Sequence, residues 1–298
     1  MMIENLTTEK RNINSENLDK MTPIEFVKVM NEEDKKVAIA IEKISSEIAL
    51  AIEIVSRKLK NGGRLIYVGA GTSGRLGILD AVECVPTFGV DSSEILGIIA
   101  GGEKAFTHSV EGAEDSLEFA INDLKEINLN QNDALIGIAA SGRTPYVISA
   151  LKYGNEVNAS TISISCNLNS EMSKYSKVSL EVDCGSEVLT GSTRLKAGTA
   201  QKMILNMIST GAMVQCGKVY GNLMVDVRAT NEKLVDRCKR IVMSATGVDR
   251  DTATSFLEKS NFNAKIAITM ILGKFNYDEA VEKLKDSDGF VRDAIIKR

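Results

Sequence analysis

The sequence has little of what several common functional sites require. Histidine occurs once, at His108, so a His-rich metal centre or a Ser-His-Asp triad could form only around that residue. The five cysteines are scattered and contain no C-x-x-C pair, which argues against structural disulfides and against a zinc site. We therefore expect no metal site, buried small apolar cysteines, and carboxylates as the groups that carry any proton transfer.

Long apolar runs and an excess of basic charge are also absent. No run approaches the roughly 20 apolar residues that cross a bilayer, so we expect no membrane partner. The N-terminal segment lacks the apolar core of a secretion signal, which predicts a cytoplasmic protein. Lys and Arg number 36 against 40 Asp and Glu, and this balance argues against a nucleic-acid partner.

Five short apolar runs rich in β-branched residues alternate with helical patterns. The runs cover residues 65–69, 95–99, 134–139, 161–165 and 178–182, and the helical patterns lie near 74–84, 112–126, 145–154 and 192–216. This alternation predicts an α/β fold with a parallel sheet that is covered on both faces. In such sheets ligands bind beyond the carboxyl ends of the strands.

The two ends of the chain differ from this middle part. Residues 1 to about 20 are polar and aperiodic, and we expect an arm that packs on a neighbour or on the body. From about Pro23 the pattern turns helical, and between Ile41 and Leu59 apolar residues recur at steps of three and four, which predicts one long amphipathic helix. After about Leu234 we expect three to five short helices, with Asp249 and Asn276 in good N-cap positions.

These patterns predict three parts of the chain. They are an arm and long helix over 1–60, a sheet domain over 61–234, and a small helical module over 235–298.

Two segments share one pattern: an apolar strand, a turn of small and hydroxyl residues, then a helix. They are 65–77 (LIYVGAGTSGRLG) and 135–147 (LIGIAASGRTPYV). A helix that starts this way directs unpaired N–H groups and the positive end of its dipole at a ligand. We therefore predict a small phosphorylated ligand held by these residues: Gly71, Thr72, Ser73, Ser141, Gly142 and Thr144.

Other interpretations of the two turns remain open. Residues 69–74 satisfy G-x-G-x-x-G, which alone is a weak signal for dinucleotide binding. The acidic partner of that motif could be Asp91, but Asp91 precedes the second strand instead of ending it. No G-x-x-x-x-G-K-[ST] motif occurs. Either turn could also need its glycines for packing only.

Acidic residues between the two turns are the candidates for proton transfer. Glu111, Glu114, Asp115 and Glu118 would share one face if residues 112–126 formed a single helix. Carboxylates held close together retain a proton more readily, which suits acid–base work, although a solvated first helical turn is the alternative. Glu83 has apolar neighbours, so we expect it to be buried and to keep a proton as a general acid does.

A third polar cluster covers residues 190–202. It places Ser192, Thr193 and Lys196 at the start of a helix. An anion-binding helix N-terminus and a simple Ser/Thr cap both remain open here.

With these residues in view, the chain resembles the N-acetylmuramic acid 6-phosphate etherases, which are relatives of the glucokinase regulatory protein in the sugar isomerase (SIS) superfamily. The resemblance covers nearly the whole chain. It is carried by residues 6–12 (LTTEKRN), 69–77 (GAGTSGRLG), 80–88 (DAVECVPTF), 100–103 (AGGE), 110–115 (VEGAED), 140–146 (ASGRTPY) and 191–202 (GSTRLKAGTAQK). Ile13 departs from the family, which usually has proline there, and His108 occupies a variable position that suits a surface or helix-start residue.

The resemblance implies a three-layer αβα sandwich with a five-stranded parallel sheet and a C-terminal module similar to ubiquitin-associated (UBA) domains. It also implies a homodimer, an amino-sugar phosphate substrate, no cofactor, and a lyase reaction that releases D-lactate by elimination and water addition in cell-wall sugar recycling. Glu83 would be the proton donor and Glu114 the base, with Glu103, Ser192, Thr193 and Lys196 as further substrate contacts. A non-catalytic sugar-phosphate sensor and an aldose–ketose isomerase are the alternatives within the superfamily.

Overall fold

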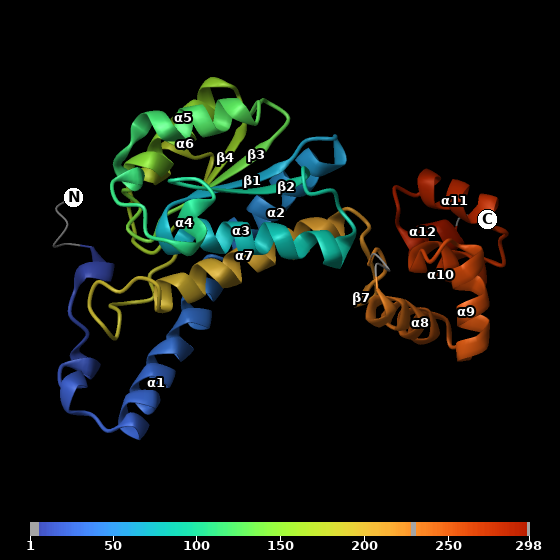
Figure 1. The fold of residues 1–298 in the computed structure, drawn as a ribbon, viewed down its shortest axis with the longest axis horizontal. Helices are drawn as coiled ribbons and strands as arrows, with labels where there is room; N and C mark the ends of the chain where they lie inside the picture. The colour runs from blue at the N-terminus through green and yellow to red at the C-terminus, as the bar shows by residue number, and fades with distance from the viewer. Residues whose placement is uncertain (1–5, 228–230, 297–298) are drawn as a thin grey trace. The chain divides into compact units, whose positions relative to one another are not determined.

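The computed structural model describes residues 6–227 and 231–296, which form two compact units (Figure 1). The first unit comprises Met1–Ala81 and Ser93–Ser209, and the second comprises Val82–Ser92 and Thr210–Arg298. The helices α3 (Gly71–Phe88) and α7 (Lys196–Gln215) each contribute residues to both units. The boundaries that the sequence predicts near residues 60 and 234 stay predictions.

The first unit contains a sheet of five parallel strands in the order β2-β1-β3-β4-β5. The strands are β1 (Leu65–Gly69), β2 (Ile95–Ile99), β3 (Ala134–Ile138), β4 (Ser160–Ser165) and β5 (Val178–Glu181). Each coincides with one of the five apolar runs, except that β4 begins one residue before its run, so the predicted parallel sheet is confirmed. Every residue of β1 and β3 is buried, as expected for strands that are covered on both faces.

Helices cover both faces of this sheet and make a three-layer αβα sandwich. The helices α5 (Leu117–Glu126) and α6 (Pro145–Glu156) lie on one face, where Val147 and Leu151 pack against the backbone of Gly137. On the other face lie α2 (Ser45–Lys60) and the first parts of α3 and α7 (Figure 1). The predicted fold class is therefore confirmed.

The predicted long N-terminal helix is wrong in one respect, because the structure divides it. Helix α1 covers Pro23–Glu42, and α2 begins only at Ser45. The hydroxyl of Ser45 donates to the carbonyl of Glu42 at 2.6 Å and so takes an acceptor that a continuing helix would use. The apolar spacing of three and four runs from Ile41 across this break to Leu59, so it does not indicate the interruption.

The N-terminal arm packs on the body of the first unit. The amide of Asn12 donates to the carbonyl of Ser186 at 2.9 Å, and the hydroxyl of Ser15 donates to the carbonyl of Val188 at 2.7 Å. These bonds explain why a polar, aperiodic segment is ordered over residues 6–20. The first five residues of the predicted arm lie outside the described residues.

The second unit is mainly helical. A hairpin of β6 (Val219–Tyr220) and β7 (Leu223–Met224) precedes five helices: α8 (Glu232–Thr246), α9 (Arg250–Lys259), α10 (Ala264–Gly273), α11 (Tyr277–Asp286) and α12 (Val291–Ile296). Helix α10 packs against the other four, and its Ala264, Ala267 and Ile268 are fully buried. The N-caps are confirmed, since Asp249 accepts from the backbone of Thr252 and Asn276 accepts from that of Glu279.

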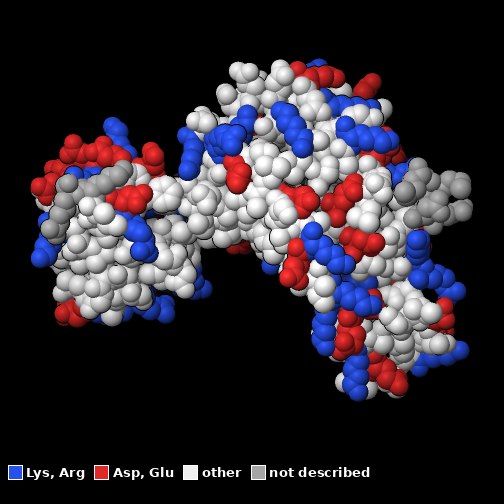
Figure 2. Space-filling model, turned by 180° about the vertical axis from the view of Figure 1, so that it is seen from behind, with Lys and Arg blue, Asp and Glu red and all other residues white. Residues whose placement is uncertain are grey.

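On the face shown in Figure 2, basic and acidic side chains are interspersed, in keeping with their near-equal numbers. Among the described residues no helix has both the length and the apolar character needed to cross a bilayer.

The first unit also contains several short elements. The helix α4 (Lys104–Thr107) follows β2, and 3-10 turns occur at η2 (Thr7–Glu9), η3 (Ile13–Ser15), η4 (Leu18–Lys20), η5 (Ala113–Asp115) and η6 (Met172–Tyr175).

Candidate active site

The order of the strands brings the two hydroxyl-rich turns to one place. Strand β1 pairs with both β2 and β3, and Gly69 lies directly opposite Ile138 in the register. The turns that follow β1 and β3 therefore start side by side at the carboxyl edge of the sheet. The chain passes from β1 to β2 on one side and returns to β3 on the other, so this is the switch point where such sheets bind ligands.

The first turn has the geometry of an anion-binding helix start. Gly71 has φ +53°, and a side chain on Gly74 would lie only 2.8 Å from the carbonyl oxygen of Gly69. This close approach starts α3 directly at the end of β1. The N–H groups of the residues before Gly74 have no partner within the helix, and they suit a phosphate.

The hydroxyl side chains of this turn face the start of α7. Ser73 is buried, and its hydroxyl donates to Gln201 Oε1 at 2.9 Å. The methyl group of Thr72 lies 3.5 Å from where a side chain on Gly198 would begin. Helix α7 therefore fixes the position of the turn from behind.

The second turn precedes α6. Gly142 has φ +69°, and its backbone N–H donates to the carbonyl of Ala139 at 3.0 Å. Thr144 is the N-cap of α6 but makes no side-chain capping bond, and Pro145 occupies the first helical position. The oxygen of Ser141 accepts from the backbone of Arg143 at 3.2 Å.

A cavity of about 350 Å³ opens beside the first turn. It is lined by Ala70, Gly71, Arg75, Ala100, Ala105, and 108–115. Of the predicted site residues, Gly71 and Glu114 line it. The other phosphate-turn residues, together with Glu83, Glu103, Ser192, Thr193 and Lys196, do not.

The acidic segment is not the continuous helix that its spacing predicts. Gly112 has φ +73°, η5 covers Ala113–Asp115, and Ser116 is extended and caps α5, which begins at Leu117. The prediction of four carboxylates on one helix face is therefore wrong. Instead, the cavity is lined by Glu111, Glu114 and Asp115, all exposed, while Glu118 lies on the first turn of α5.

Arg75 is a cavity residue that the sequence interpretation missed. Its Nε donates to the carbonyl of Phe106 at 2.8 Å, and one terminal nitrogen donates to the carbonyl of His108 at 3.2 Å. These bonds hold a positive charge in the lining of the cavity that also contains the three carboxylates. Its position within the conspicuous motif of residues 69–77 was the available signal. His108 itself is exposed and ends α4 rather than starting a helix.

Glu83 lies in the second half of α3 and is exposed, so the expectation that it is buried is wrong. It follows Gly71 by twelve residues, which is about 18 Å along a helix axis. Its neighbours Leu79 and Val82 are also exposed, at 47% and 61%. The burial that would keep a proton on Glu83 is therefore not observed.

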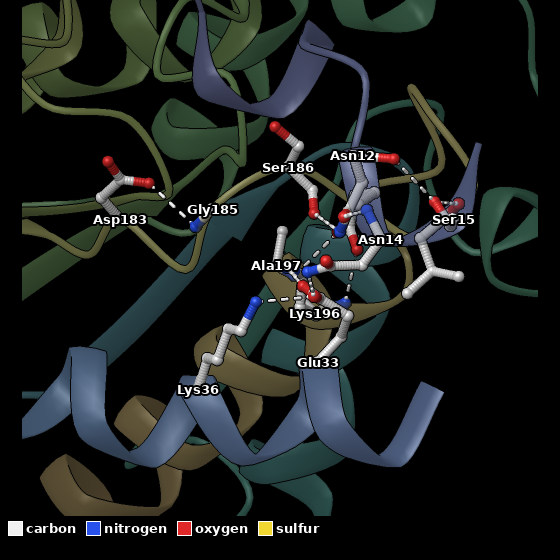
Figure 3. A network of polar contacts seen from close by, with 12 residues as sticks. Asn12, Asn14, Ser15, Glu33, Lys36, Asp183, Gly185, Ser186, Lys196 and Ala197 are labelled. Carbon is white, nitrogen blue, oxygen red and sulfur yellow. Dashed lines mark hydrogen bonds and ion pairs between the residues drawn. The ribbon is translucent and has the colours of Figure 1, made fainter. Parts of the chain in front are cut away.

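The third polar cluster has a different organisation from either prediction (Figure 3). Glu187 accepts from the backbone N–H groups of Lys196 and Ala197, both at 2.9 Å, and so caps the start of α7 with a carboxylate. The ammonium of Lys196 is buried and pairs with Glu33 of α1 at 2.6 Å. The first two N–H groups of α7 therefore have a protein acceptor and need neither a substrate anion nor a Ser/Thr cap.

Glu33 is the centre of that network. Its second carboxylate oxygen accepts from Asn14 at 2.8 Å and from Lys36 at 2.6 Å (Figure 3). Burial favours the protonated form, but Lys196, Lys36 and Asn14 outweigh it and lower the pKa of Glu33 to about 2. For Glu187, burial prevails over the two backbone bonds and raises its pKa.

The remaining predicted contacts are peripheral to the cavity. Glu103 is exposed before α4, and Ser192 and Thr193 are half-buried in the loop between β5 and α7. Among residues 6–227 and 231–296, no group of three or more His, Cys, Asp or Glu side chains is arranged to hold a metal ion. Four of the five cysteines are buried, as expected, and Cys216 is half-buried.

Comparison with known proteins identifies relatives along the whole chain. The pattern of the glucokinase regulatory protein N-terminal SIS domain matches residues 47–155, that of the SIS domain matches 120–210, and that of a UBA-like domain matches 242–273. N-acetylmuramic acid 6-phosphate etherases from Bacillus cytotoxicus and Bacillus mycoides are 62% and 60% identical over 294 residues. Both alignments cover 99% of this chain and 100% of the relative.

A solved structure supports the fold alone. A phosphoheptose isomerase from Francisella tularensis is 16% identical and has a TM-score of 0.51, with 65% of this chain and 100% of that chain covered.

Proposed function

We propose, since the chain belongs to the family of N-acetylmuramic acid 6-phosphate etherases, that it cleaves the D-lactyl ether of N-acetylmuramic acid 6-phosphate. The products are N-acetylglucosamine 6-phosphate and D-lactate. Beyond family membership, one observation carries the proposal. Glu114 lies in a cavity beside the first phosphate turn, at the switch point of the sheet.

The proposed reaction is an elimination followed by a water addition. A base removes the proton at C2, the bond from C3 to the ether oxygen breaks, and the departing lactate oxygen takes a proton. Water then adds to the unsaturated intermediate, with hydroxyl at C3 and a proton at C2. Two carboxylates supply these steps without a cofactor, with Glu114 as the base and Glu83 as the proton donor.

The substrate phosphate is proposed to bind between the two turns. Its donors would be the N–H groups at the start of α3 with Thr72 and Ser73, and those at the start of α6 with Ser141 and Thr144. The three cavity carboxylates outnumber the one cation, Arg75, so the cavity lining repels a dianion and favours an orientation in which the phosphate meets the turns and the sugar carbons meet Glu114.

We place Glu83 in the site of a second copy of the chain within a homodimer. Three observations support this part of the proposal: Glu83 is exposed, it does not line its own chain's cavity, and it is flanked by exposed Leu79 and Val82. Apolar side chains next to a carboxylate are what a subunit contact would cover. The exposed Ile24 and Val27 of α1 add apolar surface that a partner could bury.

The proposal also places the reaction in the cytoplasm and in the recycling of cell-wall amino sugars. Its support is the substrate that the relatives' name prints, which is a phosphorylated amino sugar.

The first test is product formation. Purified protein incubated with N-acetylmuramic acid 6-phosphate should release D-lactate and N-acetylglucosamine 6-phosphate in equal amounts, measured by coupled assay and mass spectrometry. In water enriched in ¹⁸O, the label should enter the sugar at C3. Interconversion of hexose phosphates without lactate release would assign an isomerase instead.

The second test asks whether one site uses both copies. Glu83→Gln and Glu114→Gln should each inactivate the homodimer. A one-to-one mixture, dissociated and reassembled, should recover about a quarter of the wild-type rate, because half of the dimers are mixed and each holds one intact site. No recovery, with mixed dimers shown to form, would place both glutamates in one chain.

A further inference from the structure

Gln201 contacts the phosphate turn from α7 and has no role in the function proposed above. Its side chain is 1% exposed, and its Oε1 accepts the hydroxyl hydrogen of Ser73 at 2.9 Å. The two residues are 128 positions apart in the sequence, so the contact depends on the packing of α7 against the start of α3.

The other end of the Gln201 amide is unusual. Its Nε2 is buried and has no hydrogen-bond partner among the residues that the structure describes. A buried donor without an acceptor costs about 1–3 kcal/mol, so such a group in a native protein calls for an explanation.

The direction of the bond also conflicts with a phosphate-binding role for Ser73. A hydroxyl has one hydrogen, and here that hydrogen is given to Gln201. Ser73 then offers only lone pairs to an approaching dianion, which they repel.

We infer that Gln201 is a positioning residue that directs the Ser73 hydroxyl at the substrate phosphate, an inference that rests on the proposed function. When the amide turns over about its last bond, Nε2 takes the place of Oε1 and donates to Ser73 Oγ across the same separation. The hydroxyl hydrogen of Ser73 is then free to donate to a phosphate oxygen. The donors are then aligned in one direction, from the amide to the hydroxyl to the dianion. The unpaired Nε2 gains an acceptor, while Oε1 gives up the Ser73 hydrogen, which passes to the phosphate.

The start of α7 is held firmly enough for this task. Glu187 binds its first two N–H groups, Lys196 ties it to Glu33, and Gly198 lies against Thr72. Gln201 follows within two turns of that anchored end. Its amide therefore meets Ser73 at a fixed distance before any ligand binds, which reduces the entropy lost on binding.

Gln201→Glu and Gln201→Leu separate this role from mere packing. Glutamate has the shape of glutamine but only accepts, so it keeps the Ser73 hydrogen and adds a negative charge. We expect Gln201→Glu to raise the KM for N-acetylmuramic acid 6-phosphate at least tenfold, with kcat within about threefold of wild type. Gln201→Leu should raise the KM less, because it adds no charge. Gln215→Glu, the same change at the exposed end of α7, is the control and should leave both constants unchanged.

Binding of inorganic phosphate and of N-acetylglucosamine 6-phosphate, measured by calorimetry, gives a readout that does not depend on turnover. Both ligands should bind at least tenfold more weakly to Gln201→Glu. A structural role predicts the opposite order, in which the shape-matched Glu is milder than Leu. That order, or unchanged binding in both variants, would overturn the inference.

Ser73→Ala distinguishes failure of this inference from failure of the proposed function. If Ser73→Ala leaves phosphate binding unchanged, the proposed phosphate role of Ser73 is wrong, and the role of Gln201 with it. If Ser73→Ala weakens binding but Gln201→Glu does not, only the inference about Gln201 is wrong. In a Ser73→Ala background, Gln201→Leu should add no further loss of affinity, because the hydroxyl that it positions is gone.

Discussion

Carboxylates gather in two places in the first unit, and their surroundings differ. At the cavity, Glu111, Glu114 and Asp115 are exposed, and within the described residues none of them forms an ion pair. In the network behind α7, Glu33 is 2% exposed, and both of its oxygens accept hydrogen bonds. The first group is exposed to solvent, whereas Glu33 is paired with cations and hydrogen-bond donors of the protein.

The difference follows from the cost of burying charge. An unpaired carboxylate in low dielectric costs several kcal/mol, so Glu33 could be buried only with Lys196 and its hydrogen-bond donors in place. Exposed carboxylates carry no such requirement and keep their oxygens available for a reacting proton. Comparing the two regions therefore separates residues that stabilise the fold from residues that could perform chemistry.

The largest expected effect is on turnover, at the cavity. Glu114→Gln should lower kcat about 10²–10⁴-fold, because it removes a general base while it keeps the size of the side chain. The melting temperature should stay within a degree of wild type, since Glu114 is exposed and unpaired. D-lactate release and thermal unfolding measure the two quantities.

Glu118→Gln is the matched control for that change, because Glu118 is exposed nearby but does not line the cavity. It should leave kcat unchanged. Equal losses in both variants would show that overall negative charge, rather than a base at one position, determines the rate.

The next largest effect is on stability, in the network. Glu33→Ala should lower the free energy of unfolding by about 3–5 kcal/mol, because it leaves the Lys196 ammonium buried without its partner. The neighbouring Glu32→Ala removes an exposed pair with Lys35 and should cost under about 0.5 kcal/mol. Denaturant titration of both variants makes the comparison, and equal losses would mean that Glu33 is not neutralised in the way described.

A pH titration of stability sharpens the same contrast. The pKa of Glu33 is lowered in the folded chain from 4.5 to about 2, so its stabilisation is complete above pH 4.5 and is lost as the pH decreases toward 2. The difference in unfolding free energy between wild type and Glu33→Gln should therefore shrink by about 3 kcal/mol over that interval.

The raised pKa of Glu187 acts in the opposite direction, because a group that binds its proton more tightly when folded favours the folded state at low pH. Glu187 is present in both proteins, so its contribution cancels in the difference. A difference that does not change with pH would contradict the ionised state of Glu33.

Much of the fold could be predicted from local sequence, because its signals are local. Buried parallel strands such as β1 and β3 are continuous apolar runs, and the hydroxyl-rich turns directly follow them. Asp249 and Asn276 precede their helices by one position, so the caps could be predicted as well.

What the sequence could not predict depends on contacts between distant residues or on backbone angles. Nothing within α1 distinguishes Glu33 from Glu32, since the burial of Glu33 requires Lys196, 163 positions away. The acidic segment has helical spacing, but the left-handed angle of Gly112 and the extended Ser116 break it into separate pieces. The candidate site could likewise be predicted only in part. A sequence motif predicts its turns, but it does not predict the contact of Ser73 with Gln201.

The smallest effect tests how the charge of Glu33 is shared between its two cations. Lys36 and Lys196 both lie 2.6 Å from the carboxylate, but the Lys36 side chain is 52% exposed and that of Lys196 only 2%. Water screens the exposed pair of Lys36 and Glu33, and it can hydrate the carboxylate oxygen when Lys36 is removed. Lys36→Ala should therefore lower the free energy of unfolding by under about 1 kcal/mol in denaturant titration, and by less at high salt. Lys36→Gln, which keeps a hydrogen-bond donor of similar reach, should recover part of that loss. A loss as large as that of Glu33→Ala would mean that both cations neutralise the carboxylate equally. Solvent would then screen the exposed pair of Lys36 and Glu33 no more than it screens the buried pair of Lys196 and Glu33.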